Sequence, residues 1–480
     1  MNTRALEAIG IPPGLVRLAK QVLATARAGG LERKRVRPEL EAVVRCPADH
    51  RDHPLFGALA RALEEAAARG EGPRPTYDAL APWKQWGDDI DPQAIEQMRQ
   101  AMRLPVAVAG ALMPDAHVGY GLPIGGVLAT ENAVVPYAVG VDIACRMKLS
   151  VFDAPVEWLE SRSDRLSAAI ENETRFGMGA AFGGRGDRSA RPRSHPVLDD
   201  DWSVSPVTIA CRDKARAQLG TSGSGNHFVE FGTLTVDSTQ ATALGLASAG
   251  TFLALLSHSG SRGTGAAVCE HYSKLAMRRC PDLPGPMRHL AWLSLDSEEG
   301  REYWAAMQLM GRYAAANHAV IHRHVAEALG VETILGIENH HNFAWEETHD
   351  VGGRARRVVV HRKGATPASP GALGIIPGSM ATPGFVVRGL GGAGSLASAS
   401  HGAGRRMSRT KARESYRWAG VKGFLADRNV RLISAGIDEV PHAYKDIHEV
   451  MAAQADLVER LGRFEPRLVK MAPDGERAED

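Results

Sequence analysis

Cysteine is scarce in this sequence. The 480 residues include five cysteines, an odd number, and no two of them form a Cys-x-x-Cys pair. This pattern argues against a disulfide framework and fits a reducing compartment, so we expect a cytoplasmic protein. A chain of this length can bury a substantial core without covalent support.

A large net charge and a long hydrophobic run are also missing. The formal net charge is only +2, so any contact with nucleic acid must come from local clusters of arginine and lysine. No stretch reaches the roughly 18 apolar residues that span a bilayer, and the first residues, Met-Asn-Thr-Arg-Ala, contain no apolar signal segment. We therefore expect no membrane span and no signal peptide.

The composition and the spacing of apolar residues change along the chain. Residues 1–90 are rich in alanine, leucine, arginine and glutamate, and residues 15–27 and 55–69 have the spacing of amphipathic helices. Later, short apolar runs alternate with glycine-rich turns, which predicts a mixed α and β fold. We therefore expect a helical extension over 1–90 and one larger body over 91–471.

Further elements follow from composition and periodicity. We expect a connector over 73–82, an exposed insertion over 184–201, where arginine, serine and proline dominate, and a polar tail over 472–480. The predicted helices cover residues 264–279, 298–328, 405–418 and 444–461, and the predicted strands cover residues 143–151, 333–337, 357–361, 373–376, 385–387 and 395–400.

Four segments place strong metal ligands beside glycine, at the expected ends of strands: 139–145, 223–230, 257–263 and 339–342. Together they offer a carboxylate, a thiolate and several imidazoles, a mixture that binds first-row transition metals. A thiolate can bridge two ions, so five such ligands suffice for a two-metal centre. The simpler interpretation is that the histidines are structural, that the cysteine belongs to the core and that the aspartate caps a turn.

Three glycine turns have the form of anion sites. Residues 400–404, Ser-His-Gly-Ala-Gly, stand between a predicted strand and a predicted helix, which directs backbone N–H groups at one place. A neutral imidazole there can attack phosphorus if its other nitrogen is held by a partner. Residues 377–380 and 258–265 form similar turns. Each turn alone is readily explained as an ordinary one, but three beside histidine or serine favour a nucleotide site.

Taken in order, these segments resemble the RtcB family of RNA ligases. The resemblance covers residues 105–470 or so, apart from the insertion. The motifs that carry it are Met113-Pro-Asp-Ala-His117, Val141-Asp-Ile-Ala-Cys145, Gly223-Ser-Gly-Asn-His-Phe-Val-Glu230, His258-Ser-Gly-Ser-Arg262, His340-His-Asn342, Arg362-Lys-Gly-Ala365, Ile376-Pro-Gly-Ser-Met380, Ser400-His-Gly-Ala-Gly404, Met407-Ser-Arg409 and Ala443-Tyr-Lys-Asp446.

The resemblance implies an RtcB-like α/β fold of mixed α and β type, in which a central β-structure flanked by helices lines a deep metal-binding cleft. It implies an enzyme of RNA repair or tRNA splicing. Such an enzyme joins RNA ends that carry a 2′,3′-cyclic phosphate or 3′-phosphate to 5′-hydroxyl ends, and it uses two Mn²⁺ ions and GTP. An archease-type activator, and a monomeric or homodimeric state, are in keeping with it.

Position by position, the resemblance assigns Asp142, Cys145 and His227 to one manganese ion, and Cys145, His258 and His341 to the other. The ligands alone would equally accept cobalt or zinc. His401 would be the catalytic residue that takes GMP from GTP. The nucleotide would be surrounded by Asn226, His227, Phe228, Val229, Glu230, His341, Asn342, Pro377, Gly378, Ser379, Met380, Gly384, His401, Gly402, Ala403, Gly404 and Lys470.

Several positions depart from the usual family pattern, and they put RNA positioning and sealing in question more than metal binding. The departures are Tyr120 in place of lysine, Ala144 and Arg146 in place of glycines, His318 in place of arginine, and Gly384 in place of a serine that contacts the nucleotide. The register of Lys470 rests on an altered C-terminal motif.

RNA phosphates have several candidate partners beside the motifs. Two other functions stay open: a metal-dependent phosphodiesterase or nucleotidyl transferase that caps or trims RNA ends without sealing, and a non-catalytic RNA-repair binding factor. The candidate phosphate contacts are Arg262, Arg362, Lys363, Arg405, Arg409 and Lys411.

Overall fold

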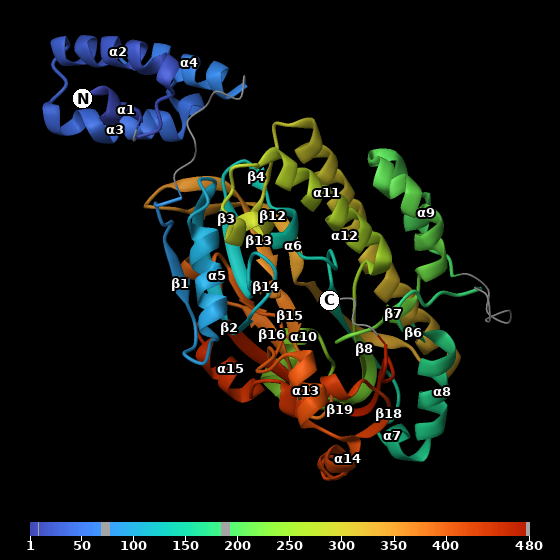
Figure 1. The fold of residues 1–480 in the computed structure, drawn as a ribbon. Helices are drawn as coiled ribbons and strands as arrows, with labels where there is room; N and C mark the ends of the chain where they lie inside the picture. The colour runs from blue at the N-terminus through green and yellow to red at the C-terminus, as the bar shows by residue number, and fades with distance from the viewer. Residues whose placement is uncertain (8, 69–76, 184–192, 477–480) are drawn as a thin grey trace. The chain divides into compact units, whose positions relative to one another are not determined.

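The structure is a computed structural model that describes residues 1–7, 9–68, 77–183 and 193–476 (Figure 1). Its contacts divide the chain into two compact units. The first consists of Met1–Leu80 with Arg103–Pro105, and the second of Ala81–Met102 with Val106–Asp480. In the described ranges, no helix combines the length and the apolar character that crossing a membrane requires.

The first unit is helical and has a core of its own. Its amphipathic helices bury leucine, valine and alanine side chains around Phe56 and Leu59. The helices predicted over 15–27 and 55–69 are confirmed. Residues 33–45, between them, form a further helix. The elements are α1 (Thr3–Glu7), η1 (Pro13–Leu15), α2 (Val16–Ala28), α3 (Arg33–Arg45), η2 (Pro47–His50) and α4 (Gly57–Ala68).

The second unit is built on a large sheet, and it confirms the predicted mixed α and β class. Apart from one parallel pairing, between β18 and β19, the strands are antiparallel. In spatial order they are β11 (Thr333–His340), β5 (Arg146–Phe152), β9 (Gly250–Ser259), β8 (Phe228–Val236), β19 (Val458–Met471), β16 (Gly384–Gly389) and β15 (Leu373–Ile376), and β18 (Arg431–Ser434) pairs with β19.

A second sheet and three short pairings complete the β-structure. The second sheet has the order β1 (Trp83–Gln85), β2 (Ala107–His117), β3 (Ile124–Thr130), β13 (Ala355–Lys363) and β12 (Asn342–Asp350). The short pairings are β10 (Leu293–Ser294) with β4 (Ala133–Val134), β14 (Ala365–Pro367) with β17 (Ser398–Ser400), and β6 (Arg175–Phe176) with β7 (Thr221–Gly223).

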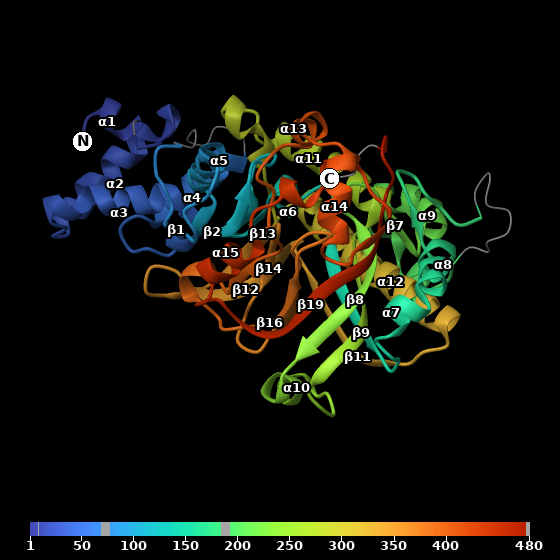
Figure 2. The ribbon, with the colours of Figure 1, turned by 90° about the horizontal axis from the view of Figure 1, so that it is seen from below.

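Helices cover these sheets. The long helix α12 (Glu298–Leu329) packs Ile321 and Val325 against the large sheet, and α11 (Arg262–Arg279) runs beside it (Figure 1). Figure 2 shows α10 (Ser238–Leu244) at the far end of the hairpin of β8 and β9. The other helices are α5 (Pro92–Met102), α6 (Pro136–Val139), α7 (Trp158–Ser161), α8 (Ser163–Glu173), α9 (Pro206–Gln218), α13 (Arg409–Ser415), α14 (Trp418–Ala426) and α15 (Ile447–Ala453).

Several predicted elements differ from the structure. The strand predicted over 143–151 begins only at Arg146, because Ala144 adopts a left-handed backbone with φ 57°. The strand predicted over 395–400 shrinks to Ser398–Ser400, because Leu396 and Ala397 also have positive φ. The helix predicted over 444–461 is wrong beyond α15, because the chain from Val458 pairs with β8 and β16 instead.

The helix predicted over 405–418 is also shorter than expected. Ser408 caps α13, so this helix begins at Arg409 and ends at Ser415, and a separate helix, α14, follows. The helix N-terminus that was expected to follow residues 400–404 closely therefore lies further along the chain.

The insertion and tail are only partly within the described residues. Residues 184–192 and 477–480 fall outside them, as do residues 69–76 next to and within the predicted connector. Where the insertion is described, Val197 and Leu198 are buried, whereas Ser194, Pro196, Asp199 and Asp201 are exposed. In the tail, Asp474 accepts hydrogen bonds from Trp418 and from the backbone of Ile437.

Candidate functional site

Four strand ends meet at one edge of the large sheet. β11, β5, β9 and β8 are antiparallel neighbours, so the ends of β11 and β9 lie beside the starts of β5 and β8. In register, Arg146 lies opposite both His340 and Ser259, and Phe228 lies opposite His258. The candidate ligands brought to this edge are Cys145, His227, His258 and His341.

These residues, with Asp142, form two overlapping groups of three. The ligand atoms of Asp142, Cys145 and His227 lie within 4.8 Å of one another, and so do those of Cys145, His258 and His341. All five residues are buried. The Cys145 Sγ atom is common to both groups, at 3.4 Å from Nε2 of His227 and 3.1 Å from Nε2 of His258.

A backbone carbonyl fixes the proton on one of the imidazoles. Nδ1 of His258 lies 3.1 Å from the carbonyl oxygen of Asn226, which only accepts hydrogen bonds, so Nδ1 carries the proton. The neutral His258 ring then presents the Nε2 lone pair on the side of Cys145. Nδ1 of His227 lies 2.8 Å from the carbonyl oxygen of Ser222 and 3.1 Å from Nη1 of Arg262, which only donates, so these two neighbours favour opposite tautomers of His227.

Potential ligand atoms lie close together in the cluster. Nε2 of His227 lies 3.1 Å from Oδ2 of Asp142, and Nε2 of His258 lies 3.1 Å from Nε2 of His341. Burial lowers the pKa of His258 to about 3 and holds the pKa of His341 well below its usual value, so both rings are neutral at pH 7. The buried Nδ1 of His341 has no hydrogen-bond partner among the described residues, and this donor set fits a cation.

The N-terminus of α11 holds the carboxylate of this cluster. Ser261 donates from its backbone N–H to Oδ1 of Asp142 at 2.9 Å, and its hydroxyl donates to the carbonyl of Ile143 at 2.6 Å. Burial raises the pKa of Asp142, but contacts with His227 and Arg262 outweigh it, so the pKa is lowered. The carboxyl is thus ionised and oriented toward His227.

His401 lies beside this cluster and is held by Asp115. Nδ1 of His401 lies 2.7 Å from Oδ2 of Asp115, which also accepts from the backbone N–H groups of His401 and Gly402. The Asp115 side chain is fully buried. A carboxylate accepts here, so Nδ1 carries the proton and Nε2 holds the lone pair. Motif Met113–His117 contained Asp115, but nothing in the sequence alone assigned it this partner.

Close packing sets the position of the His401 loop. Gly404 has φ 73°, and a Cβ atom there would lie 2.0 Å from the carbonyl oxygen of Asp115, so only glycine fits. The rings of His401 and His341 have centroids 4.9 Å apart. The imidazole expected to take GMP is therefore next to a candidate metal ligand.

The residues expected around a nucleotide lie mostly near this loop. The Pro377 carbonyl oxygen lies 3.4 Å from the Cβ position of Gly402, and Gly384 lies against Pro377. Phe228 and Met380 share one apolar cluster, and Asn342 accepts from the backbone N–H of Gly364. The turn 377–380 is closed by hydrogen bonds between Ser379 and Thr382, Gly378 packs against Thr382, and Ala403 is buried in the core.

Three of the expected nucleotide contacts have other surroundings. Val229 is fully buried, and burial raises the pKa of Glu230 well above its usual value. Lys470 lies opposite Val229 on β19, but its Nζ is 3.2 Å from Oε1 of Glu171 and faces the Phe176 ring. Any nucleotide contact of Lys470 would require it to leave that ion pair.

Most of the expected phosphate contacts are buried and paired inside the protein. Arg362 is 1% exposed and forms a two-bond ion pair with Glu347. Arg405 and Arg409 pair with Glu439. Nη1 of Arg262 lies 3.1 Å from Nδ1 of His227, and Lys363 donates to the carbonyl of Tyr120. Of these six candidates, Lys411 alone is exposed.

Two departures from the family pattern are also internal. His318 is completely buried, with Nδ1 at 2.7 Å from the Ser257 hydroxyl and Nε2 at 3.0 Å from the Ser259 carbonyl. Arg146 is buried and pairs with Glu338. The charge lost at position 318, which we expected to weaken RNA positioning, therefore lies in the protein core, and its effect on RNA stays a prediction.

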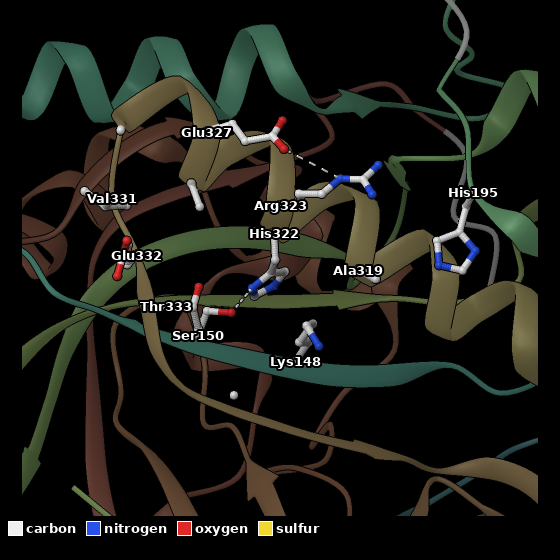
Figure 3. Close-up of a pocket in the computed structure, with 13 residues that line it drawn as sticks. Lys148, Ser150, His195, Ala319, His322, Arg323, Glu327, Val331, Glu332 and Thr333 are labelled. Atoms are coloured by element: carbon white, nitrogen blue, oxygen red, sulfur yellow. Dashed lines mark hydrogen bonds and ion pairs between the residues drawn. The ribbon is translucent and has the colours of Figure 1, made fainter.

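A cavity of about 710 Å³ lies away from the cluster (Figure 3). It is bordered by α12 and by Lys148 and Ser150 of β5. Figure 3 shows His322 bonded to Ser150, and Arg323 paired with Glu327. Side chains alternate along β9, so Ser257, which also bonds His322, points to the face opposite His258. This cavity is thus separate from the candidate metal centre.

Comparisons with known proteins agree with this geometry. The model of the family described as tRNA-splicing ligase RtcB matches residues 97–471. RNA-splicing ligase RtcB of Escherichia coli (strain K12) is 34% identical over 406 residues, which cover 79% of this chain and 94% of that protein.

Two further relatives come from distant organisms. RNA-splicing ligase RtcB of Mycobacterium tuberculosis is 35% identical and covers 75% of this chain and 95% of its own length. The tRNA-splicing ligase RtcB of Nanoarchaeum equitans is 31% identical, with 77% and 90% covered. With a family match over most of its length and relatives this similar, the chain belongs to the RtcB family.

Proposed function

We propose that this protein is an RNA ligase that joins 3′-phosphate or 2′,3′-cyclic-phosphate ends to 5′-hydroxyl ends through a histidine–GMP intermediate. The names of its relatives support the reaction class. The observation that carries the proposal is the contact between Asp115 and His401, which leaves the Nε2 lone pair of His401 free to attack phosphorus.

The proposed cations are two Mn²⁺ ions. Asp142, Cys145 and His227 would hold one, and Cys145, His258 and His341 the other, since the ligand atoms of each group lie within 4.8 Å of one another. When bound, such ions stabilise negative charge on a transferring phosphoryl group. The choice of manganese rests on the family, because the donor set also suits other first-row metals.

The protein's own part in the reaction is nucleophilic. Nε2 of His401 attacks the α-phosphorus of GTP, a P–N bond forms, and pyrophosphate leaves. The 3′-phosphate of the RNA then attacks the same phosphorus, so GMP passes to the RNA end and His401 is released. The 5′-hydroxyl of the second strand attacks the activated 3′-phosphate, forms the phosphodiester and expels GMP. Asp115 keeps the proton on Nδ1 of His401 throughout.

The nucleotide contacts proposed from the sequence belong to this function. Residues 226–230, 377–380 and 401–404, with Asn342 and Gly384, would surround GTP, and Lys470 would join them only after leaving Glu171. We also propose that residues 1–90 form an extension to a catalytic body over 91–471. A cytoplasmic location, an archease-type activator and a monomeric or homodimeric state complete the proposal.

Radiolabelled GTP tests the proposal. Incubation with GTP labelled at the α-phosphate and Mn²⁺ should give an acid-labile protein–GMP adduct that is absent in His401→Ala. His271→Ala, a change at an exposed histidine of α11, serves as the matched control and should keep the adduct. If the wild-type protein forms no adduct, the proposal is wrong.

Addition of RNA separates sealing from capping. A strand with a 3′-phosphate and a strand with a 5′-hydroxyl should be joined by the labelled protein. Accumulation of RNA that carries GMP at its 3′ end, without joining, would instead support the nucleotidyl transferase that does not seal.

A further inference from the structure

Tyr120 is the most exposed large apolar side chain among the described residues. The residue is 66% exposed, on the loop between β2 and β3. Burial of an aromatic ring contributes to folding, so an exposed ring in an ordered loop leaves that stabilisation unused. Singly exposed apolar residues are common on protein surfaces, so exposure alone assigns no role. The surroundings of Tyr120 provide the further observations.

The loop that carries Tyr120 is fixed by its backbone. Gly119 exchanges two hydrogen bonds with the side-chain amide of Gln97 on α5. The Tyr120 carbonyl accepts from Nζ of Lys363, which is buried. Gly121 has φ 72°, and its Cβ position would lie 2.8 Å from the His289 carbonyl oxygen. The backbone is therefore anchored on both sides of Tyr120 while the ring stays in solvent.

A second and a third ring support Tyr120 from one side. The rings of Tyr120 and His289 meet edge-on, with centroids 5.9 Å apart, and those of His289 and Tyr137 with centroids 4.8 Å apart. Such edge-to-face contacts hold aromatic rings in defined orientations. Tyr120 is thus pre-positioned, with its other surface available to a flat partner.

Two contacts link the backbone of the Tyr120 loop to the residues around His401. Lys363, which holds the Tyr120 carbonyl, precedes Gly364, whose Cβ position would lie 3.1 Å from Cε1 of His401. Three residues before Tyr120, His117 bonds through Nδ1 to the backbone carbonyl of Asp115, the residue that orients His401. Tyr120 is therefore carried on a loop that is anchored to the candidate reaction site.

We propose that Tyr120, supported by His289, is a positioning residue that stacks on an unpaired nucleobase next to one of the RNA ends to be joined. This inference rests on the proposed ligase function and names a subsite for its substrate. Aromatic rings stack on bases of single-stranded RNA with little regard to sequence. A stacking contact at Tyr120 also suits this site because Arg362, Arg405 and Arg409 are paired with carboxylates inside the protein.

The test compares Tyr120→Ala with Tyr120→Phe and with Ile209→Ala, a change at an exposed apolar residue of α9. The substrates are two single-stranded RNAs, one with a 3′-phosphate and one with a 5′-hydroxyl. We expect Tyr120→Ala to raise KM for one strand on the order of 10-fold, within the range that removal of a stacking ring produces. Tyr120→Phe and Ile209→Ala should leave KM unchanged.

Two readouts exclude a merely structural effect. Formation of the protein–GMP adduct without RNA should be the same in all variants, because Tyr120 is assigned no part in that step. When the two terminal nucleotides of the affected strand are replaced by abasic ones, wild type and Tyr120→Ala should have equal KM values. Equal KM with intact RNA, or an undiminished penalty with abasic RNA, would overturn the stacking role.

Failure of the ligase function gives a different result. If the wild-type protein forms no adduct, the proposed function fails, and the same labelled strands are then measured by fluorescence anisotropy. Weaker binding by Tyr120→Ala, relieved by Tyr120→Phe, would still support stacking. Equal binding by all three proteins would overturn it, and would leave Tyr120 to a protein partner instead.

Discussion

Two groups of buried histidines lie on opposite faces of the same strands, and they differ in how their nitrogens are satisfied. Behind the sheet, His318 and His322 share the Ser257 hydroxyl, and their outer nitrogens bond the Ser259 carbonyl and the Ser150 hydroxyl. Every ring nitrogen there has a conventional partner. At the strand ends, by contrast, Nε2 of His258 lies beside both Sγ of Cys145 and Nε2 of His341, and the buried Nδ1 of His341 has no hydrogen-bond partner among the described residues.

The comparison separates histidines that are fully paired inside the protein from histidines of the candidate metal centre. Both groups are buried, and burial holds the pKa of His318, His322 and His341 well below the usual value. Burial and pKa therefore do not separate the two groups. Their hydrogen-bond partners do, because a closed chain of donors and acceptors needs nothing further, whereas an unpaired buried nitrogen beside other potential ligands suits a cation.

The largest effect is expected from Cys145→Ser, which removes the sulfur common to both triads. Metal content measured by elemental analysis should fall from two manganese ions per chain to one or none. Loss of a residue that only hydrogen-bonds to a metal ligand typically lowers activity roughly 10- to 100-fold. Adduct formation in Cys145→Ser should fall by more than that. His322→Gln, which changes the histidine pair behind the sheet, should keep both ions. Equal metal loss in the two variants would contradict the difference between the two groups.

Ser257→Ala should destabilise the protein without removing metal. It deletes the hydroxyl that joins His318 to His322 and leaves two buried ring nitrogens unpaired. At about 1–3 kcal/mol for each unsatisfied group, the free energy of unfolding should fall by about 2–6 kcal/mol. Urea denaturation measures it, with the exposed Ser238→Ala as control. A loss of metal with unchanged stability would reverse the roles assigned to the two faces.

The second group should also make stability depend on pH. Burial lowers the pKa of His318 and His322, so below pH 6.5 the unfolded chain takes up protons that the native protein does not. Their contribution is complete above pH 6.5 and is lost as pH falls. In His322→Gln the slope of unfolding free energy between pH 6 and 5 should decrease by up to about 1.4 kcal/mol per unit. His271→Gln, a change at an exposed histidine, serves as the control. An unchanged slope in His322→Gln would contradict the burial of a neutral His322.

The smallest effect concerns backbone strain next to the candidate metal ligands. Ala144 has φ 57°, a conformation that costs a residue with Cβ about 1–2 kcal/mol, and glycine would relieve it. Glycine also gains entropy in the unfolded chain, so Ala144→Gly should raise the free energy of unfolding by at most about 1 kcal/mol. Thermal unfolding of the metal-free protein measures this, and a clear loss of stability would contradict the strain.

The sequence predicted elements well where periodicity was local. The long helix α12 and the strand Leu373–Ile376 follow from their apolar spacing and are confirmed. The last strand, β19, was predicted in part as helix, because its pairing partners β8 and β16 are far away in the chain. Local spacing carries no information about such partners.

The site was predictable as types of residue rather than as an arrangement. Ligand-bearing segments were recognisable beside glycine, but the antiparallel order that joins four strand ends is a property of the sheet. Asp115 was the residue missed, since its contact with His401 spans 286 positions. His318 and Arg362 were judged by charge, although burial decides what they contact.

Anomalous diffraction at the manganese edge, from crystals grown with Mn²⁺, tests the central claim most directly. Two peaks should flank Sγ of Cys145, one toward Asp142 and His227 and the other toward His258 and His341, with no peak beside His318 and His322. No peak at Cys145, or a peak at the histidine pair behind the sheet, would contradict the account.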